Sequence, residues 1–279
     1  MMNFNKDTIS NIPLASLNVV KRKSNSNKRP SIKKTKSTSK IPLSSITAIK
    51  RKDSKRPDPP KDINLVMTID TSGSMSQFSS YTIVNSINDF IDQQKKLPVN
   101  TTISITKFST NITMLYNNVD IHYVKKITYN DIYPTACTSL YDAFTNGLDI
   151  LTDLKSTSNK VLVVITDGLE NTSKTTKPEV MYKIKEGISK EVLIKYLGGG
   201  QDAIKIGIDL GIPQDCCLSF SNDNYGLGGA MLAASNSLGR HASGKSHGFT
   251  GLERVASQSQ SCSNSVNAVL SQPMGLMRV

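Results

Sequence analysis

The stretch "INLVMTIDTSGSMSQ", residues 63–77, joins a strand-like apolar run to a polar turn. Its first half, Ile63–Ile69, is an apolar run with little polar interruption, which is typical of a strand covered on both faces of a parallel sheet. Its second half places Asp70, Ser72 and Ser74 at alternate positions of a turn. Oxygen-bearing side chains therefore follow directly on a buried strand, and ligand sites in open α/β sheets lie beyond the carboxyl ends of such strands.

Strand-like and helix-like segments alternate along the rest of the chain up to about residue 240. Apolar or alternating runs predict strands at 63–69, 101–108, 112–116, 161–165, 191–197 and 217–220. Apolar residues at helical spacing predict helices at 83–97, 140–154, 178–188, 202–210 and 229–238. This order predicts an α/β fold with a doubly wound, mostly parallel, Rossmann-like sheet.

Two further segments bring oxygen ligands to the same edge of the predicted sheet. Asp167 follows a continuous β-branched strand, and Thr138 lies in the loop before the clearest helix. With Asp70, Ser72 and Ser74 they form a shell of two carboxylates and three hydroxyls, without histidine or thiol. Such a shell suits a hard divalent cation, so we expect Mg²⁺, with Mn²⁺ as a possible substitute. Taken alone, the residues at 70–74 could instead form an Asx-turn and a helix N-cap.

These segments resemble the von Willebrand factor type A (vWA) domain over roughly residues 61–243. The similar stretches are "DTSGSM" (70–75), "TSLYDAF" (138–144), "TDG" (166–168) and "YLGGGQDAIKIGIDLGIP" (196–213). The resemblance implies a metal-ion-dependent adhesion site (MIDAS) whose metal residues are Asp70, Ser72, Ser74, Thr138 and Asp167. It departs from the family pattern at Ala136 and Cys137, where many members have glycine before the threonine.

The resemblance also implies a protein-interaction module and not an enzyme. The cation would accept an acidic side chain from a partner protein. A metal-dependent phosphoester hydrolase with Asp70 as nucleophile is the alternative, but Ser72 stands where that chemistry needs a second acid. We expect Asp142 to be structural near a helix N-terminus, and Glu170 to be an exposed loop charge.

The net charge of +12 is concentrated before residue 62. Residues 1–61 contain 16 Lys and Arg against 3 Asp and Glu, and the remainder contains 18 against 19. We predict three parts: a disordered, basic, Ser/Lys-rich tail with a proline linker at 1–60, a vWA domain at 61–243, and a partly disordered extension at 244–279. The tail could tether the protein to nucleic acid or to an anionic surface.

No apolar run approaches the roughly 18 residues needed to span a membrane, and residues 1–30 lack the apolar core of a signal peptide. We therefore expect an intracellular protein, either cytoplasmic or nuclear. The cysteines, Cys137, Cys216, Cys217 and Cys262, show no metal-binding spacing, and the histidines, His122, His241 and His247, show no ligand pairing. The letters "GRHASGKS" (239–246) match a phosphate loop, but a predicted helix precedes them where that motif needs a strand.

Overall fold

The computed structural model describes residues 61–200 and 202–258. The disorder predicted for residues 1–60, and for the extension beyond residue 258, lies outside this part of the chain.

Six strands form one sheet in the order β3-β2-β1-β4-β5-β6. The β2–β3 pair is antiparallel and all other neighbours are parallel. The strands are β1 (Ile63–Asp70), β2 (Thr101–Phe108), β3 (Ile112–Asp120), β4 (Asn159–Thr166), β5 (Val192–Gly199) and β6 (Cys217–Phe220). The predicted α/β class and the mostly parallel sheet are confirmed.

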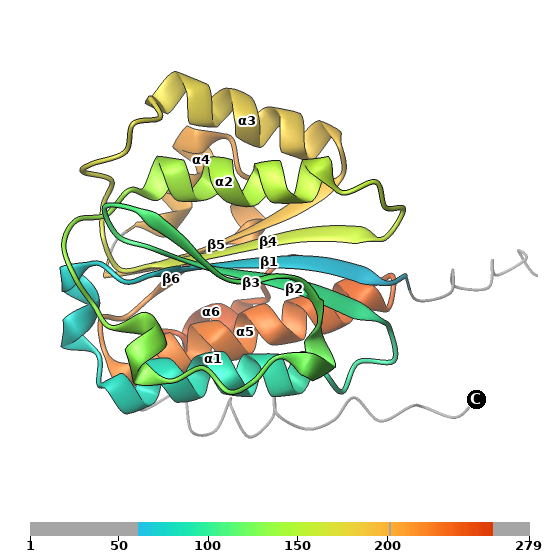
Figure 1. The fold of residues 1–279 in the computed structure, drawn as a ribbon, viewed down its shortest axis with the longest axis horizontal. Helices are drawn as coiled ribbons and strands as arrows, with labels where there is room; N and C mark the ends of the chain where they lie inside the picture. The colour runs from blue at the N-terminus through green and yellow to red at the C-terminus, as the bar shows by residue number, and fades with distance from the viewer. Residues whose placement is uncertain (1–60, 201, 259–279) are drawn as a thin grey trace, which may run out of the picture. The chain divides into compact units, whose positions relative to one another are not determined.

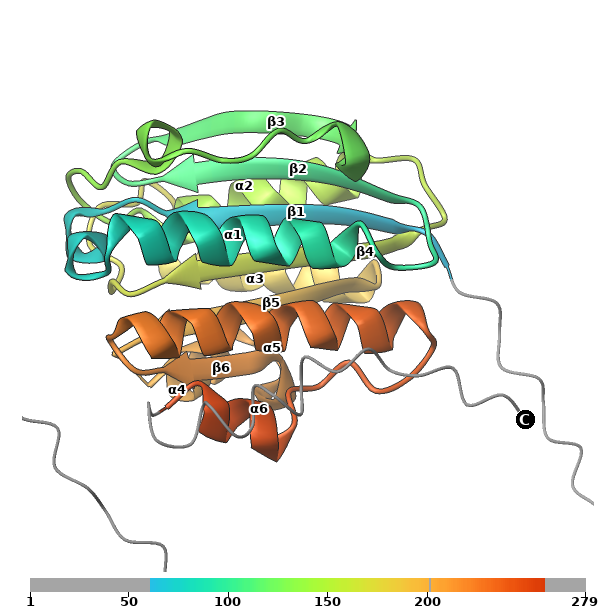
Figure 2. The same cartoon turned by 90° about the horizontal axis from the view of Figure 1, so that it is seen from below.

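Helices cover both faces of the sheet (Figure 1). They are α1 (Ser80–Gln94), α2 (Leu140–Asp153), α3 (Lys177–Ser189), α4 (Ala203–Leu210), α5 (Asn224–Ala242) and α6 (Gly251–Ala256). The helices α1 and α5 lie side by side on one face, and α2, α3 and α4 lie on the other (Figures 1 and 2). The sheet is therefore doubly wound, with a separate apolar core in each layer.

The alternation of side chains along β1 explains the two cores. Leu65 and Met67 point into the cluster that contains the apolar residues of α1 and α5. Val66 points into the opposite cluster, with Phe144 of α2 and Tyr196 of β5. Because successive side chains of a strand point to opposite faces, an apolar run such as residues 63–67 serves both layers.

Strand β3 and helix α5 are longer than predicted, and a further helix follows α5. Strand β3 continues to Asp120, and α5 begins at Asn224, capped by the side chain of Asp223. Beyond residue 243, Phe249 belongs to the apolar core, and the unpredicted helix α6 packs on α5 and β6. Gly239 lies inside α5, so the letters that match a phosphate loop begin in a helix. Among the described residues, no helix is both long and apolar enough to cross a membrane.

The strand order reverses direction at β1, which pairs with β2 on one side and β4 on the other. Ile69 pairs with Ile165, so Asp70 and Thr166 follow side by side at the carboxyl ends of β1 and β4. The turn after β1 lies at the side of the molecule where the arrows of β2 and β4 end (Figure 2). We call this edge of the sheet the rim.

Candidate metal centre

Asp70 is a buried carboxylate at the rim, with 1% of its surface exposed. Its Oδ1 accepts a hydrogen bond from the backbone N of Ser72 at 2.6 Å, and its Oδ2 accepts one from Thr166 Oγ1 at 2.5 Å. Burial raises the pKa of Asp70 from 3.8 to about 6, although both hydrogen bonds oppose the shift. The raised pKa means that the ionised form of Asp70 is less stable in the folded protein than in water.

The turn after Asp70 connects it to the carboxylate of Asp167. The hydroxyls of Ser72 and Ser74 lie 3.0 Å apart, and Ser74 Oγ donates to Asp167 Oδ1 at 2.7 Å. The side-chain amide of Gln77, in the short helix η2 (Gly73–Gln77), donates to Asp167 Oδ2 at 2.6 Å. Ser72 and Asp167 are buried, whereas Ser74 and Gln77 are exposed, so the network opens to solvent at the turn.

Thr138 completes the group of predicted residues. A Cβ atom built on Gly168 would lie 2.7 Å from Thr138 Oγ1 and 3.4 Å from Ser74 Oγ, so both hydroxyls approach the backbone next to Asp167. A side chain at position 168 would displace the Thr138 hydroxyl, which explains the glycine in "TDG". The structure thus brings Asp70, Ser72, Ser74, Thr138 and Asp167 together at the rim.

Asn171 fixes the backbone of Thr138. Its Oδ1 accepts from Thr138 N at 2.9 Å, and its own N donates to Thr138 O at 3.1 Å. Two bonds between these residues set the position of the Thr138 hydroxyl relative to the loop that carries Asp167. Sequence analysis missed Asn171, Gln77 and Thr166, because each acts on a predicted site residue through a contact that depends on the fold.

The loop before Thr138 is held against the turn after β1. Thr135 N donates to Thr71 O at 2.7 Å, and Gly73 N donates to Ala136 O at 3.0 Å. Ala136 has a φ of +61°, in the left-handed region that residues with a Cβ atom rarely adopt. The departure from the family pattern noted at Ala136 therefore coincides with a strained backbone position.

Glu170 is not the exposed charge that we predicted. Its carboxylate accepts from the backbone N atoms of Tyr141, Thr172 and Ser173 and from Ser173 Oγ, at 2.6–3.0 Å. Asp142 accepts from the backbone N atoms of Lys174 and Thr175 at 3.0 and 2.8 Å, which agrees with its predicted structural role. These two acids join the first turn of α2 to the loop after β4, and this places Thr138 beside Asp167.

The donor set of the rim fits a hard divalent cation. All five side chains offer oxygen, and two of them are carboxylates. Within the part of the chain that the structure describes, the ion pairs do not include Asp70 or Asp167. The rim therefore concentrates negative charge that a bound cation would neutralise.

Comparison with solved structures finds several proteins that are similar to this chain. The pilus adhesin SpaC from Lactobacillus rhamnosus GG has a TM-score of 0.53 and 12% identity, covering 65% of this chain and 31% of its own. Proximal thread matrix protein 1 from the mussel byssus has a TM-score of 0.48 and 18% identity, covering 61% of this chain and 44% of its own. A structure of the same mussel protein with a zinc-occupied MIDAS motif has a TM-score of 0.44 and 17% identity, with 61% and 43% coverage.

This chain thus spans less than half the length of each of these structures. A search of curated proteins found no significant match. The sequence profile of the von Willebrand factor type A domain matches residues 64–205, which include all five rim residues and just over half of the chain. The chain therefore belongs to the von Willebrand factor type A domain family.

Proposed function

We propose that this domain is a metal-dependent protein-interaction module. Its rim would hold Mg²⁺, or Mn²⁺ in its place, through Asp70, Ser72, Ser74, Thr138 and Asp167. The bound cation would supply an open coordination position for a carboxylate of a partner protein. The observation that carries the proposal is the pair of carboxylates at the rim, Asp70 and Asp167, joined by hydroxyls and without a cationic partner among the described residues.

The exposure of the rim residues supports access from one side. Asp70, Ser72 and Thr138 are buried and held by hydrogen bonds, so they can keep a fixed geometry. Ser74 and Gln77 face solvent, and an acidic side chain would approach past them. Neutral hydroxyls keep a bound cation electrophilic, because only two of the five ligands carry charge.

Metal binding and partner binding can be tested separately. Mn²⁺ titration followed by electron paramagnetic resonance should show one rim site that Mg²⁺ displaces and that Asp70→Asn abolishes. Asp149→Asn is the matched control, because Asp149 is a half-exposed acid in a surface pair with Lys183. An array of peptides with and without Asp or Glu, probed in Mg²⁺ and in EDTA, should then show acid-dependent and Mg²⁺-dependent binding. Peptide binding that persists in EDTA and in Asp70→Asn contradicts the proposal.

We infer a binding role and not an enzymatic one. Ser72 occupies the position where an aspartyl-phosphate mechanism needs a second acid, and its hydroxyl is bonded to Ser74. Among the described residues, the hydrogen bonds to Asp70 come from Ser72 and Thr166, and not from a lysine or histidine that could serve as a general acid. Mg²⁺-dependent hydrolysis of phosphoesters that is lost in Asp70→Asn would establish the hydrolase alternative.

The basic segment 1–60 is the basis for a second candidate function. Its excess of Lys and Arg over Asp and Glu supports binding to nucleic acid or another anionic surface. Such binding would take place inside the cell, in the cytoplasm or nucleus. Nucleic-acid affinity should fall steeply with salt and should disappear when residues 1–58 are deleted. Equal binding by the full chain and the deletion variant would assign nucleic-acid binding to another part of the protein.

A further inference from the structure

A second group of metal-binding side chains lies away from the rim. The ligand atoms of Asp215, Cys216 and His247 lie within 4.8 Å of one another. Asp215 and Cys216 end the short helix η5 (Gln214–Cys216) at the start of β6, whereas the rim lies at the ends of β1 and β4. We propose that Asp215, Cys216 and His247 form a zinc site that joins the loop after α5 to the edge strand β6.

The backbone around the cluster brings the two segments into direct contact. Phe249 N donates to Asp215 O at 2.7 Å. A Cβ built on Gly248 would lie 2.6 Å from Asp215 Oδ2, so the chain at Gly248 passes close to the Asp215 carboxylate. His247 is therefore held next to Asp215 and Cys216 by the path of the main chain, although 31 positions separate it from Cys216 (247 minus 216).

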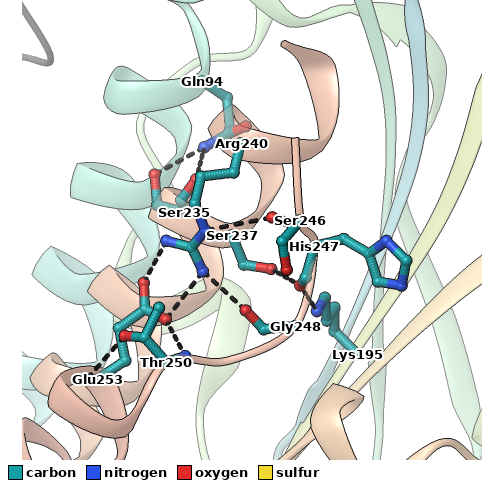
Figure 3. Close-up of polar contacts among 10 residues, drawn as sticks. All are labelled: Gln94, Lys195, Ser235, Ser237, Arg240, Ser246, His247, Gly248, Thr250 and Glu253. Atoms are coloured by element: carbon teal, nitrogen blue, oxygen red, sulfur yellow. Dashed lines mark hydrogen bonds and ion pairs between the residues drawn. The ribbon is translucent and has the colours of Figure 1, made fainter. Parts of the chain in front are cut away.

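The loop that carries His247 is fixed by side chains from three elements (Figure 3). Lys195 of β5 and Ser237 of α5 both donate to the carbonyl of His247. Arg240 donates to Gly248 O at 2.9 Å and forms a two-bond ion pair, at 2.7 and 2.9 Å, with Glu253 of α6, which is fully buried. These bonds hold the backbone and leave the His247 ring available, which is the preorganisation that a metal site requires.

Lys195 is a buried cation beside the cluster. Its Nζ lies 3.8 Å from Cys216 Sγ and 4.5 Å from the centre of the Phe249 ring, in addition to its bond to His247 O. Burial raises the pKa of Cys216 to about 11, and the Lys195 ammonium opposes this shift, so a bound metal would displace the thiol proton. Asp215 and the Cys216 thiolate together carry two negative charges, which balance a divalent ion.

The ligand types decide which ion fits. A thiolate, an imidazole and a carboxylate suit Zn²⁺ and other borderline ions, whereas the all-oxygen rim suits Mg²⁺. Asp215 and His247 both reach solvent, so a water molecule can take the fourth position. Cys216 is buried, with 1% exposure, which shields the sulfur from oxidants in solution. The ring of His241 lies edge-on to that of His247, with 5.7 Å between the ring centres.

Cobalt(II) provides a direct test, because a thiolate ligand gives Co²⁺ an intense charge-transfer absorption. The full chain, reduced and in excess Mg²⁺ to fill the rim, should bind one Co²⁺ with this band, and Zn²⁺ should displace it. Cys216→Ser should abolish the band, and His247→Gln should weaken Co²⁺ binding by at least about tenfold. Cys217→Ser is the matched control, because Cys217 is equally buried and adjacent to Cys216 but is not one of the clustered ligands, and it should keep the band.

Absence of the band in the wild-type chain, or its persistence in Cys216→Ser, would overturn the proposal. His247 lies in a loop and reaches solvent, so His247→Gln tests the site even if Cys216→Ser does not fold. At the same concentration, Zn²⁺ should raise the Tm of the wild-type chain more than that of His247→Gln, and equal shifts in both would also contradict the site. Asp70→Asn should leave the cobalt band unaltered, which separates this result from any failure of the rim proposal.

Discussion

The buried carboxylate of Asp70 couples the stability of the domain to pH. Burial raises its pKa in the folded state from 3.8 to about 6, so between these values the folded protein binds more protons than the unfolded chain. The free energy of unfolding should therefore increase as pH falls from about 6 to about 4, by on the order of 3 kcal/mol from this group. Urea unfolding in EDTA across this range, compared with Asp70→Asn, isolates the contribution, and parallel pH profiles for the two proteins would exclude it.

The same carboxylate should oppose folding at neutral pH when no cation is bound. Asp70→Asn removes the buried charge, and Thr166 Oγ1 can then accept from the new amide while it donates to Gly168 O, 3.1 Å away. We expect the variant to be more stable than wild type by about 1–2 kcal/mol at pH 7 in EDTA. The gain is smaller than the full effect of removing the buried charge, because the variant also loses charge-assisted hydrogen bonds. The variant should bind no Mn²⁺. A variant that is destabilised in EDTA would show that the Asp70 charge is compensated within the fold.

Ala136 carries local strain beside the rim. Its φ of +61° places its backbone in the left-handed region, where the Cβ of alanine causes a steric strain that glycine avoids. Ala136→Gly should stabilise the domain by about 0.5–1 kcal/mol, after the entropic cost of a glycine is subtracted. Chemical denaturation measures this change. Ala203→Gly, in the first turn of α4, is the control and should destabilise, since its backbone is helical.

At the scale of elements, the loop between β4 and α3 positions the threonine of the rim. Glu170 of this loop accepts from the backbone of α2, and Asp142 of α2 accepts from the backbone of the loop. Asn171 of the loop holds the backbone of Thr138. The geometry of the rim therefore depends on two loops that lie 33 residues apart at Thr138 and Asn171 and are joined by hydrogen bonds between backbone N atoms and side chains.

Asn171→Ala should remove one of the two hydrogen bonds that hold the backbone of Thr138, while every proposed metal ligand remains in place. Affinity for Mn²⁺ should fall about tenfold, as is typical when a residue that orients a ligand is removed. Asn117→Ala, an exposed asparagine in β3, is the matched control and should leave affinity unchanged. Equal affinities of the two variants would mean that Thr138 is held by its other neighbours.

At the scale of the whole molecule, cation binding at the rim should stabilise the fold. Asp70 ends β1 and Asp167 directly follows β4, and these two strands lie at the centre of the sheet, so an ion that joins them acts on the central part of the domain. At a Mg²⁺ concentration 100 times the dissociation constant, the gain should be about 2.7 kcal/mol. Differential scanning fluorimetry in Mg²⁺ and in EDTA measures the shift in Tm. The shift should be absent in Asp70→Asn, and an equal shift in that variant would place the stabilising ion elsewhere.

The order and type of the main elements follow from local patterns in the sequence. Apolar runs such as residues 63–67 and 161–165 and the helical spacing of 140–154 are local patterns, and the structure forms strands and a helix there. The positions of Asp70, Thr138 and Asp167 at one edge of the sheet could also be predicted. Once the strands are parallel, their carboxyl ends and the loops that follow must meet at one side.

The tertiary structure alone decided which residues support the rim and which form the second cluster. Glu170 caps α2, Gln77 contacts Asp167, and His247 lies beside Cys216, and none of these pairs is marked by a local period or by motif spacing. Their side chains meet because separate loops pack on a common core, and the path of a loop depends on long-range contacts. Local propensity could therefore give the strands and helices of this protein, whereas the contacts between its loops required the folded chain.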